Sequence, residues 1–128
     1  MSTNAHGKHI FLDYNGFFPT KHQDGTWVLQ LLQQVVARSS ATEVHAHVEL
    51  FDGIDSPPGF AAVVLLDESH LTAHCYSELG WLAIDAFTCG GTDPSAMVAD
   101  LKTVLGSEIP NLVLMQEQKV NRFLHLED

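Results

Sequence analysis

Two extended runs joined by a very short turn constrain the fold of this chain more than any other feature. The runs are Ser69–Tyr76 and Gly80–Thr88, and only Ser77–Leu79 separates them. Apolar and aromatic residues recur along both runs, and a connection this short leaves room only for a reversal of direction. The sequence therefore predicts an antiparallel β-hairpin.

A serine and a cysteine meet at the open end of this predicted hairpin. Facing residues have numbers that sum to about 157, so Ser69 lies opposite Thr88 and one step from Cys89. His74 does not join them, because it lies roughly 16 Å along the strand from Ser69 and points to the other face. A histidine placed there can act on Ser69 from a second copy of the chain, related by a two-fold axis. The spacing thus favours a homodimer with a shared site, if all three residues serve one mechanism.

Hydrophobic periodicity and end signals predict the remaining elements. The predicted strands are Lys8–Tyr14, Glu43–Phe51, Phe60–Leu66 and Asn111–Gln116, and the predicted helices run from Thr26 to Arg38 and from Pro94 to Gly106. Asp24 or Thr26 caps the first helix, and Asp93 caps the second. The segment Asn121–Asp128 is predicted to be a loosely held tail.

The order of these elements defines the expected architecture. Strand, helix, four strands, helix, strand predicts an α+β fold for a single domain of residues 1–128. We expect a two-layer sandwich, with a mostly antiparallel sheet and helices packed on one face. The strand Glu43–Phe51 fits this arrangement, because its alternation predicts one buried face. That face carries Val44, Ala46, Val48 and Leu50.

Composition narrows the classes of function. The 6 basic and 16 acidic residues give a formal net charge of −10, which argues against a nucleic-acid or anionic-membrane partner and suits a cationic substrate. The chain has no run of about 18 apolar residues and no basic-then-apolar leader at Met1–His9, so we expect a cytoplasmic protein without a membrane span. Cys75 and Cys89 are too few for a disulfide framework.

Each candidate residue also has a structural interpretation when it is taken singly. Ser69 fits a hydrogen-bonded turn serine, and Glu68 fits a residue that shapes the same turn. His74 fits a surface histidine, and Cys89 fits a small buried hydrophobe. Only the combination of these residues argues for catalysis.

A metal site is the main alternative from a different chemistry. His45 and His47 share one strand face, and His70, His74 or Glu49 could complete a tetrahedral set. Two histidines at i and i+2 are a weak signal in a chain with 8 histidines. We therefore expect no metal in the site.

The central segment resembles the bacterial S-adenosylmethionine decarboxylase family. The resemblance rests on Glu-Ser-His-Leu-Thr-x-His at residues 68–74, on Glu78 and Gly80 in the turn, and on Ala-Ile-Asp-Ala-Phe-Thr-Cys-Gly at residues 83–90. Gly-Lys-His-Ile at residues 7–10 is similar to the first strand of the family. The resemblance thus covers most of the chain, and its specific part is the central segment.

The resemblance implies a self-cleaving carboxy-lyase. Members of the family cut themselves before the serine and convert it to a pyruvoyl cofactor, here by a cut between Glu68 and Ser69 into residues 1–68 and 69–128. Ser69 would be the pyruvoyl precursor that forms a Schiff base with the substrate, and His74 the self-processing residue. Cys89 would be the proton donor.

The resemblance also implies a substrate and a partner. S-adenosylmethionine would be decarboxylated to the aminopropyl donor for spermidine synthesis, with Glu78 and Phe11 as substrate-binding residues. Phe51 is a further candidate for contact with the adenine ring. The small bacterial members build their sites between two protomers, which again implies a homodimer.

Departures from the family pattern leave two alternatives open. Tyr76-Ser77 stands where the family has Trp-Pro, and Ala61 stands where a serine is common. The first alternative is a pyruvoyl-dependent decarboxylase of arginine or ornithine. The second is an unprocessed, non-catalytic relative that binds a ligand or regulates a true decarboxylase.

Overall fold

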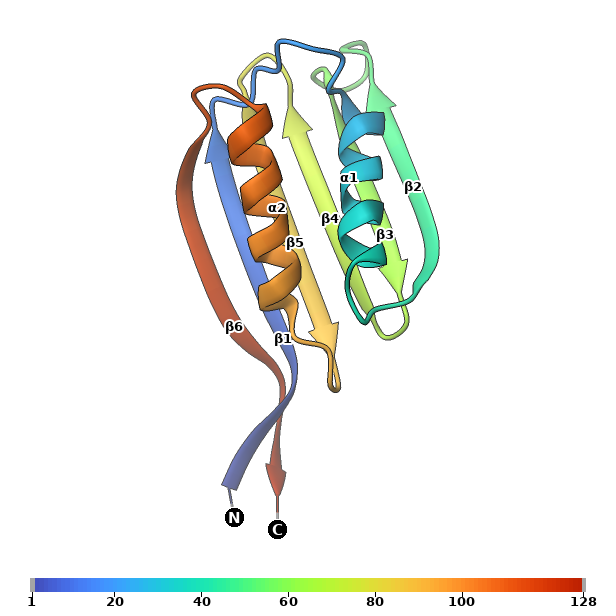
Figure 1. The fold of residues 1–128 in the computed structure, drawn as a ribbon, viewed down its shortest axis with the longest axis vertical. Coiled ribbons are helices and arrows are strands. Elements are labelled where there is room, and N and C mark those ends of the chain that lie inside the picture. Colours follow the sequence, from blue (N-terminus) through green and yellow to red (C-terminus); the bar gives the residue numbers. More distant parts are fainter. Residues whose placement is uncertain (1, 128) are drawn as a thin grey trace.

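A computed structural model describes residues 2–127 and shows one six-stranded sheet with two helices on one of its faces (Figure 1). In chain order the elements are β1 (Ser2–Asn15), α1 (Gly25–Ala37), β2 (Glu43–Phe51), β3 (Gly59–Leu66), β4 (Ser69–Tyr76), β5 (Trp81–Cys89), α2 (Pro94–Glu108) and β6 (Val113–Glu127). The strands lie in the order β2-β3-β4-β5-β1-β6, and every neighbouring pair is antiparallel. The predicted two-layer α+β class and the predicted order of elements are confirmed.

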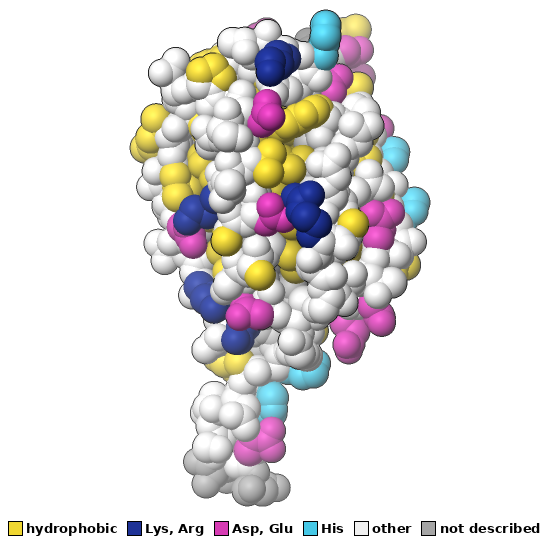
Figure 2. Space-filling model, in the orientation of Figure 1, with side chains coloured by type: hydrophobic (Ala, Val, Ile, Leu, Met, Phe, Trp, Pro, Cys, Tyr) yellow, Lys and Arg dark blue, Asp and Glu magenta, His cyan; other side chains and the backbone are white. Residues whose placement is uncertain are grey.

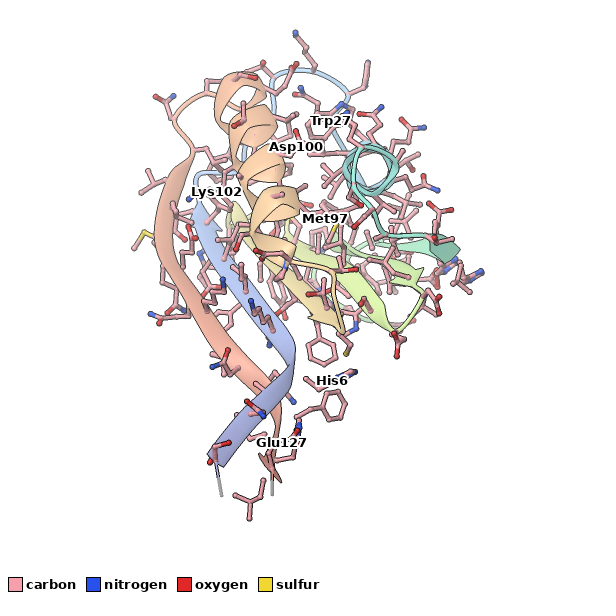
Figure 3. All side chains as sticks on the ribbon, turned by 60° about the horizontal axis from the view of Figure 1, so that its bottom comes forward. His6, Trp27, Met97, Asp100, Lys102 and Glu127 are labelled. Carbon is pink, nitrogen blue, oxygen red and sulfur yellow. The ribbon has the colours of Figure 1, made fainter. Side chains whose placement is uncertain are left out.

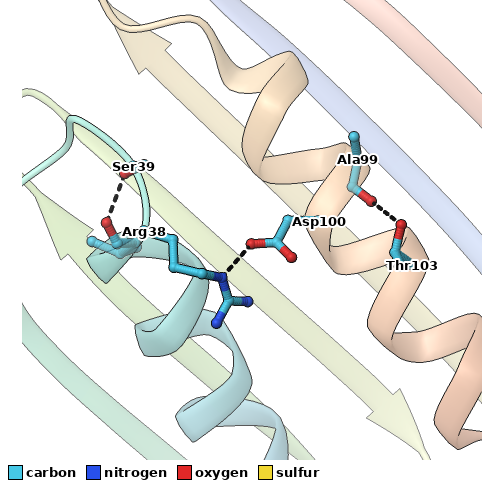
Figure 4. A network of polar contacts seen from close by, with 6 residues as sticks. Arg38, Ser39, Ala99, Asp100 and Thr103 are labelled. Atoms are coloured by element: carbon cyan, nitrogen blue, oxygen red, sulfur yellow. Dashed lines mark hydrogen bonds and ion pairs between the residues drawn. The ribbon is translucent and has the colours of Figure 1, made fainter.

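The two helices form because apolar residues recur at helical spacing behind a capping aspartate. The buried stripe of α1 consists of Val28, Leu31, Leu32, Val35 and Val36. Asp24 caps α1 by accepting a hydrogen bond from the backbone N–H of Trp27, and Asp93 caps α2 in the same way from Ser95. The ion pair of Arg38 with Asp100, at 2.8 Å, links the two helices across their exposed sides (Figure 4).

The core fills the space between the helices and the sheet. Leu12, Val64, Leu71 and Ile84 come from four neighbouring strands and are at most 1% exposed. Met97 points from α2 into the same layer (Figure 3). Each such large side chain contributes about 1.5–3 kcal/mol when it leaves water, so this layer holds both helices against the sheet.

The opposite face of the sheet carries no helix among the described residues, and we call it the open face. Burial alternates along β4, where Ser69 and Leu71 point toward the helices while His70, Thr72 and His74 point to the open face. Charged side chains of both signs lie next to one another on the helix-covered face (Figure 2). The open face carries half-exposed strand residues, among them His70 and Thr72, that no helix covers. These residues are available to a partner.

The two ends of the chain form a ribbon that the sequence did not indicate. β1 begins at Ser2, and β6 continues to Glu127, so the tail predicted to be loose is a strand. The two strands pair from Ser2 with Glu127 inward, and the ribbon projects below the sheet (Figure 1). Neither terminal segment shows a clear alternation of apolar and polar residues, and each forms a strand by pairing with the other. A prediction from the local sequence pattern therefore missed both strand ends.

The predicted strand is confirmed, but its predicted buried face is wrong outside the middle of β2. Ala46 and Val48 are half-buried, whereas Val44 and Leu50 are 65% and 58% exposed. β2 is an edge strand of about 30 Å, and α1 is only about 20 Å long, so the helix covers only the middle of the strand. The second helix also continues past Gly106 to Glu108.

Candidate active site

The structure confirms the predicted register of the hairpin. β4 and β5 pair from His70 opposite Phe87 to Tyr76 opposite Trp81. Ser69 and Cys89 therefore meet at the end of the hairpin, where the backbone N–H of Cys89 donates a hydrogen bond to Ser69 Oγ at 3.1 Å. Both residues are buried. This hydrogen bond fixes the hydroxyl at the start of β4.

The residue before Ser69 has an unusual backbone conformation. Asp67 and Glu68 form the turn between β3 and β4, and Glu68 has a φ of 64°. Left-handed conformations of residues other than glycine cost about 1–3 kcal/mol and concentrate at functional sites. The peptide bond between Glu68 and Ser69 therefore lies at a strained point of the chain.

The carboxylate of Glu68 approaches Gly90, the residue after Cys89. Glu68 Oε2 is 3.7 Å from the position that a Cβ on Gly90 would occupy. Burial raises the pKa of the Cys89 thiol, and the negative charge of Glu68 raises it further. The thiol therefore stays protonated near neutral pH, which suits a proton donor.

His74 and Glu78 do not reach this end of the hairpin within one chain. His74 is exposed on the open face, between Ala61 on β3 and Ala83 on β5. Glu78 lies in the turn between β4 and β5, at the opposite end of the hairpin from Ser69. The structure thus brings Ser69 and Cys89 together beside Glu68 and leaves His74 and Glu78 elsewhere. The separation of His74 from Ser69 is the one that strand distance and parity predict.

His74 instead lines a cavity of about 370 Å³ at the other end of the open face. The cavity is lined by Asp13, Tyr14, Asn15, His74, Tyr76, Trp81, Leu82, Ala83 and Met115. Tyr76 and Trp81 meet edge to face, with ring centroids 5.9 Å apart. The sequence did not indicate Asp13 or Trp81 as site residues, because the cavity is assembled by strands that are distant in the chain.

A second cavity, of about 570 Å³, contains Phe51. It lies between the loop that precedes α1, the end of β2 and the start of β3, and Phe17, Phe18 and Phe60 also line it. Phe51 is 37% exposed, so it belongs to a wall of this cavity and is absent from the buried core.

Phe11 lies at the middle of the open face beside a polar pair. Its ring centroid is 5.5 Å from that of His9, whose Nε2 is 2.8 Å from Asp85 Oδ1. Thr72 Oγ1 approaches the other oxygen of Asp85 at 3.5 Å. Burial and the neighbouring His9 lower the pKa of His70, while Asp85 opposes that shift. The pairing of β1 with β5 creates this group, and no local pattern predicts it.

The candidate metal ligands are not assembled. His45 and His47 lie on β2, and His70 and His74 lie on β4, with β3 between them. Two strand spacings amount to about 9.5 Å, which is too far for one ion. Across residues 2–127 no group of at least three His, Cys, Asp or Glu side chains is placed to hold a metal ion. The alternative of a metal site is therefore not supported.

No helix between residues 2 and 127 has the length and apolar character needed to cross a membrane.

Comparisons with known proteins agree on one family. A family model described as S-adenosylmethionine decarboxylase matches residues 8–117. The S-adenosylmethionine decarboxylase proenzyme of Symbiobacterium thermophilum is 34% identical over 110 residues, which cover 85% of this chain and 80% of the relative. The proenzyme of Caldanaerobacter subterraneus is 28% identical over 127 residues, which cover 94% of this chain and 99% of the relative.

A solved structure has the same fold. The crystal structure of the adenosylmethionine decarboxylase from Aquifex aeolicus superposes with a TM-score of 0.73 and 25% sequence identity. The match covers 98% of this chain and 97% of that chain. The likeness thus includes both helices and the full sheet.

Proposed function

Because the chain belongs to the S-adenosylmethionine decarboxylase family, we propose that it is a proenzyme that cuts itself between Glu68 and Ser69 and then decarboxylates S-adenosylmethionine. The observation that carries the proposal is the contact of Ser69 Oγ with the backbone N–H of Cys89, at 3.1 Å, beside a strained peptide bond. The cut yields fragments 1–68 and 69–128. The product would donate an aminopropyl group to spermidine synthesis.

Self-cleavage needs a nucleophile on the serine and a base for its α-proton. Ser69 Oγ attacks the carbonyl carbon of Glu68, so that the amide becomes an ester and the amine of Ser69 is released. A base then removes the α-proton of Ser69, and the main-chain carboxylate of Glu68 leaves with the former Ser69 Oγ. Water replaces the nitrogen of the resulting dehydroalanine, ammonia departs, and a pyruvoyl group remains at position 69. The left-handed conformation of Glu68 raises the free energy of the uncleaved chain, and cleavage, which relieves it, is favoured for that reason.

Ser69 and Cys89 fit the pyruvoyl group by position, since Ser69 is its precursor and Cys89 is its neighbour. A pyruvoyl carbonyl supplies an electrophile for the substrate amine and an electron sink while carbon dioxide leaves. Cys89 then gives its proton to the carbon that lost the carboxylate. Its burial and the neighbouring Glu68 keep the thiol neutral for this purpose.

A complete site requires a second copy of the chain. His74 and Glu78 lie away from Ser69 in one chain, and a two-fold axis across the open face would bring the partner's residues to the Ser69 end. In that arrangement His74 is the base for self-cleavage, and Glu78 and Phe11 contact the substrate. Tyr76 and Trp81, which are 47% and 50% exposed on the open face, would then be covered.

The aromatic cavity suits a cationic substrate. S-adenosylmethionine carries a sulfonium charge, and cations bind favourably over aromatic rings and beside carboxylates. Trp81, Tyr76 and Asp13 supply such groups in the cavity that His74 lines. The net charge of −10 attracts a cation from a distance. Arginine and ornithine are also cations, so the charge alone does not choose between these substrates.

A denaturing mass spectrum of the freshly purified protein tests self-cleavage. We expect two fragments that divide between Glu68 and Ser69, the second of which begins with a pyruvoyl group. The Ser69→Ala variant should remain one chain. Release of labelled carbon dioxide from S-adenosylmethionine, compared with arginine and ornithine, then tests the substrate. Release from an amino acid alone would contradict the proposed substrate.

One observation favours an unprocessed relative as the second candidate. Ala61 lies directly opposite His74 on the open face, where relatives commonly place a serine hydroxyl. If that hydroxyl is essential, the purified chain stays intact over days, and the alternative of a ligand-binding or regulatory protein replaces the proposal.

A further inference from the structure

Two neighbouring residues of β6 point to the same face of the sheet. The guanidinium carbon of Arg122 lies 5.4 Å from the ring centroid of Phe87, and the ring centroid of Phe123 lies 5.9 Å from it. Successive side chains of a regular strand point to opposite faces. Phe123 has a φ of 54°, and this left-handed conformation breaks the alternation. Phe87 pairs with His70, which points to the open face, so both side chains lie on the open face.

The ring of Phe123 lies beside the end of the sheet that carries Ser69. Its Cδ2 is 3.4 Å from the position that a Cβ on Gly7 would occupy, and Gly7 pairs with Cys89. The side chain is nevertheless 60% exposed in one chain. A left-handed φ is rare for a bulky side chain, and such strained residues concentrate at functional sites and ligand clamps. The exposed ring is therefore a candidate for contact with a partner or a substrate.

The shared site fixes which part of a second copy this ring faces. When two open faces pack together, Ser69 meets the partner's His74 only if the two-fold axis crosses β4 midway between these two positions, near Thr72. The register of the sheet carries this line to one residue on each of the next three strands, Asp85, Phe11 and Gln118. Segments that lie at equal distances from the line, on its two sides, then face each other.

Opposite Phe123 lies a wall of the partner's aromatic cavity. Gly7 and Tyr14 lie on opposite sides of Phe11 at similar distances, so the ring that covers Gly7 faces the partner near Tyr14. The pairing of β1 with β6 shifts register beside Tyr14, where Met115 is the extra residue. Met115 is 59% exposed and lines the aromatic cavity together with Tyr14. Two exposed apolar side chains of β6 thus approach each other across the axis.

We propose that Phe123 of each protomer packs against the partner's Met115 and forms the outer wall of the aromatic cavity in the shared site. A thioether and an aromatic ring attract each other, and both side chains leave water in this contact. The ring also offers a flat apolar surface to the substrate in the cavity that the partner's Trp81 lines. Phe123 is then a specificity-determining residue for the apolar part of a cationic substrate. The inference rests on the proposed function, because the shared site sets the position of the axis.

Cross-linking tests the contact without any need for catalysis. Phe123→Cys and Met115→Cys are combined in one chain, in a background that stays whole and has no other thiol: Ser69→Ala, Cys75→Ala and Cys89→Ala. Stacked sheets lie about 10 Å apart, which a short bismaleimide spans, whereas the two positions lie about 26 Å apart along β6 of one chain. The reagent should therefore join two protomers. We expect a covalent dimer on a denaturing gel, and mass spectrometry should find a linked pair of peptides that contain positions 115 and 123.

The controls separate this contact from random collision. Each single cysteine variant should stay unlinked, because the axis places like positions more than about 20 Å apart. Ile54→Cys in place of Met115→Cys should also stay unlinked, since Ile54 is 82% exposed in the loop between β2 and β3, at the other edge of the sheet. Sedimentation reports whether the unlinked protein is a dimer. A monomer, or a dimer without the link between positions 115 and 123, would overturn the inference.

Turnover tests the contact of Phe123 with the substrate. Phe123→Ala should raise KM for S-adenosylmethionine by about three- to tenfold and leave kcat and self-cleavage unchanged, whereas Phe123→Tyr, which restores a ring, should restore KM. The assays use a protein concentration at which sedimentation shows a dimer. An unchanged KM in Phe123→Ala would overturn the role in substrate binding. If the wild-type chain neither cleaves nor decarboxylates, the proposed function fails, and the cross-link still decides whether Phe123 meets the partner's Met115.

Discussion

The two ends of the β4–β5 hairpin differ in nearly every physical property. The Ser69 end is closed and polar, with Ser69 and Cys89 buried and with a left-handed backbone at Glu68 and Gly90. The His74 end is open and aromatic, with Trp81 exposed beside a cavity of about 370 Å³. The first end carries the serine and the thiol that the proposed reaction uses, whereas the second carries the aromatic cavity. Neither end has all the groups that the proposed reaction needs, and this is the reason for proposing a site shared between two protomers.

The largest effect is expected at the closed end. Cys89→Ala should lower kcat by about 10²–10³-fold, because a positioned proton donor contributes that much. Self-cleavage should continue, since the hydrogen bond to Ser69 comes from the backbone of residue 89. Steady-state turnover and a denaturing mass spectrum on one preparation check both points. Cys75→Ala is the matched control, because Cys75 is a buried thiol on the same hairpin. Equal losses in the two variants would argue against a donor at Cys89.

A smaller effect is expected at the open end. Trp81→Leu should raise KM for S-adenosylmethionine by about five- to tenfold, the loss of one cation–π contact of about 1 kcal/mol. Self-cleavage should be unchanged, because His74 is the base proposed for it and Trp81 has no group that could accept the α-proton of Ser69. Leu79→Ala, an equally exposed residue in the adjacent turn, should leave KM unchanged. A loss of self-cleavage in Trp81→Leu would contradict the assignment of Trp81 to substrate binding alone.

The smallest effect concerns stability and comes from His70 on the open face. The folded pKa of His70 is lowered, so the folded state binds fewer protons than the unfolded state as pH falls. The stability contributed by neutral His70 is present above the unfolded pKa and is lost as pH falls through the lower folded pKa. Urea unfolding at pH 7.5 and pH 5.5 should therefore show a smaller acid-induced loss in His70→Gln than in the wild type. A larger loss in the variant would reverse the sign of the expected effect.

The same contrast explains what the sequence could predict. The register of the hairpin, which brings Ser69 and Cys89 together, follows from the short turn and from the residue pattern of the two strands beside it. Both features can be read from one continuous stretch of sequence. The contact of His9 with Asp85, the ribbon that ends at Glu127 and the walls of the aromatic cavity depend on the pairing of strands far apart in the chain. Val44 is exposed because α1 is shorter than β2, a relation between two elements that no single pattern contains.

The central claim is that each site takes Ser69 from one protomer and His74 from the other, and complementation tests it most directly. Ser69→Ala and His74→Ala chains should each be uncleaved and inactive alone. When the two variants are co-expressed, they should form heterodimers with one intact site. Only the His74→Ala chain should then be cleaved. If the subunits assort randomly, the mixture should recover about one quarter of wild-type activity. Activity that stays at zero in verified heterodimers, or cleavage of the His74→Ala chain without its partner, would contradict the shared site.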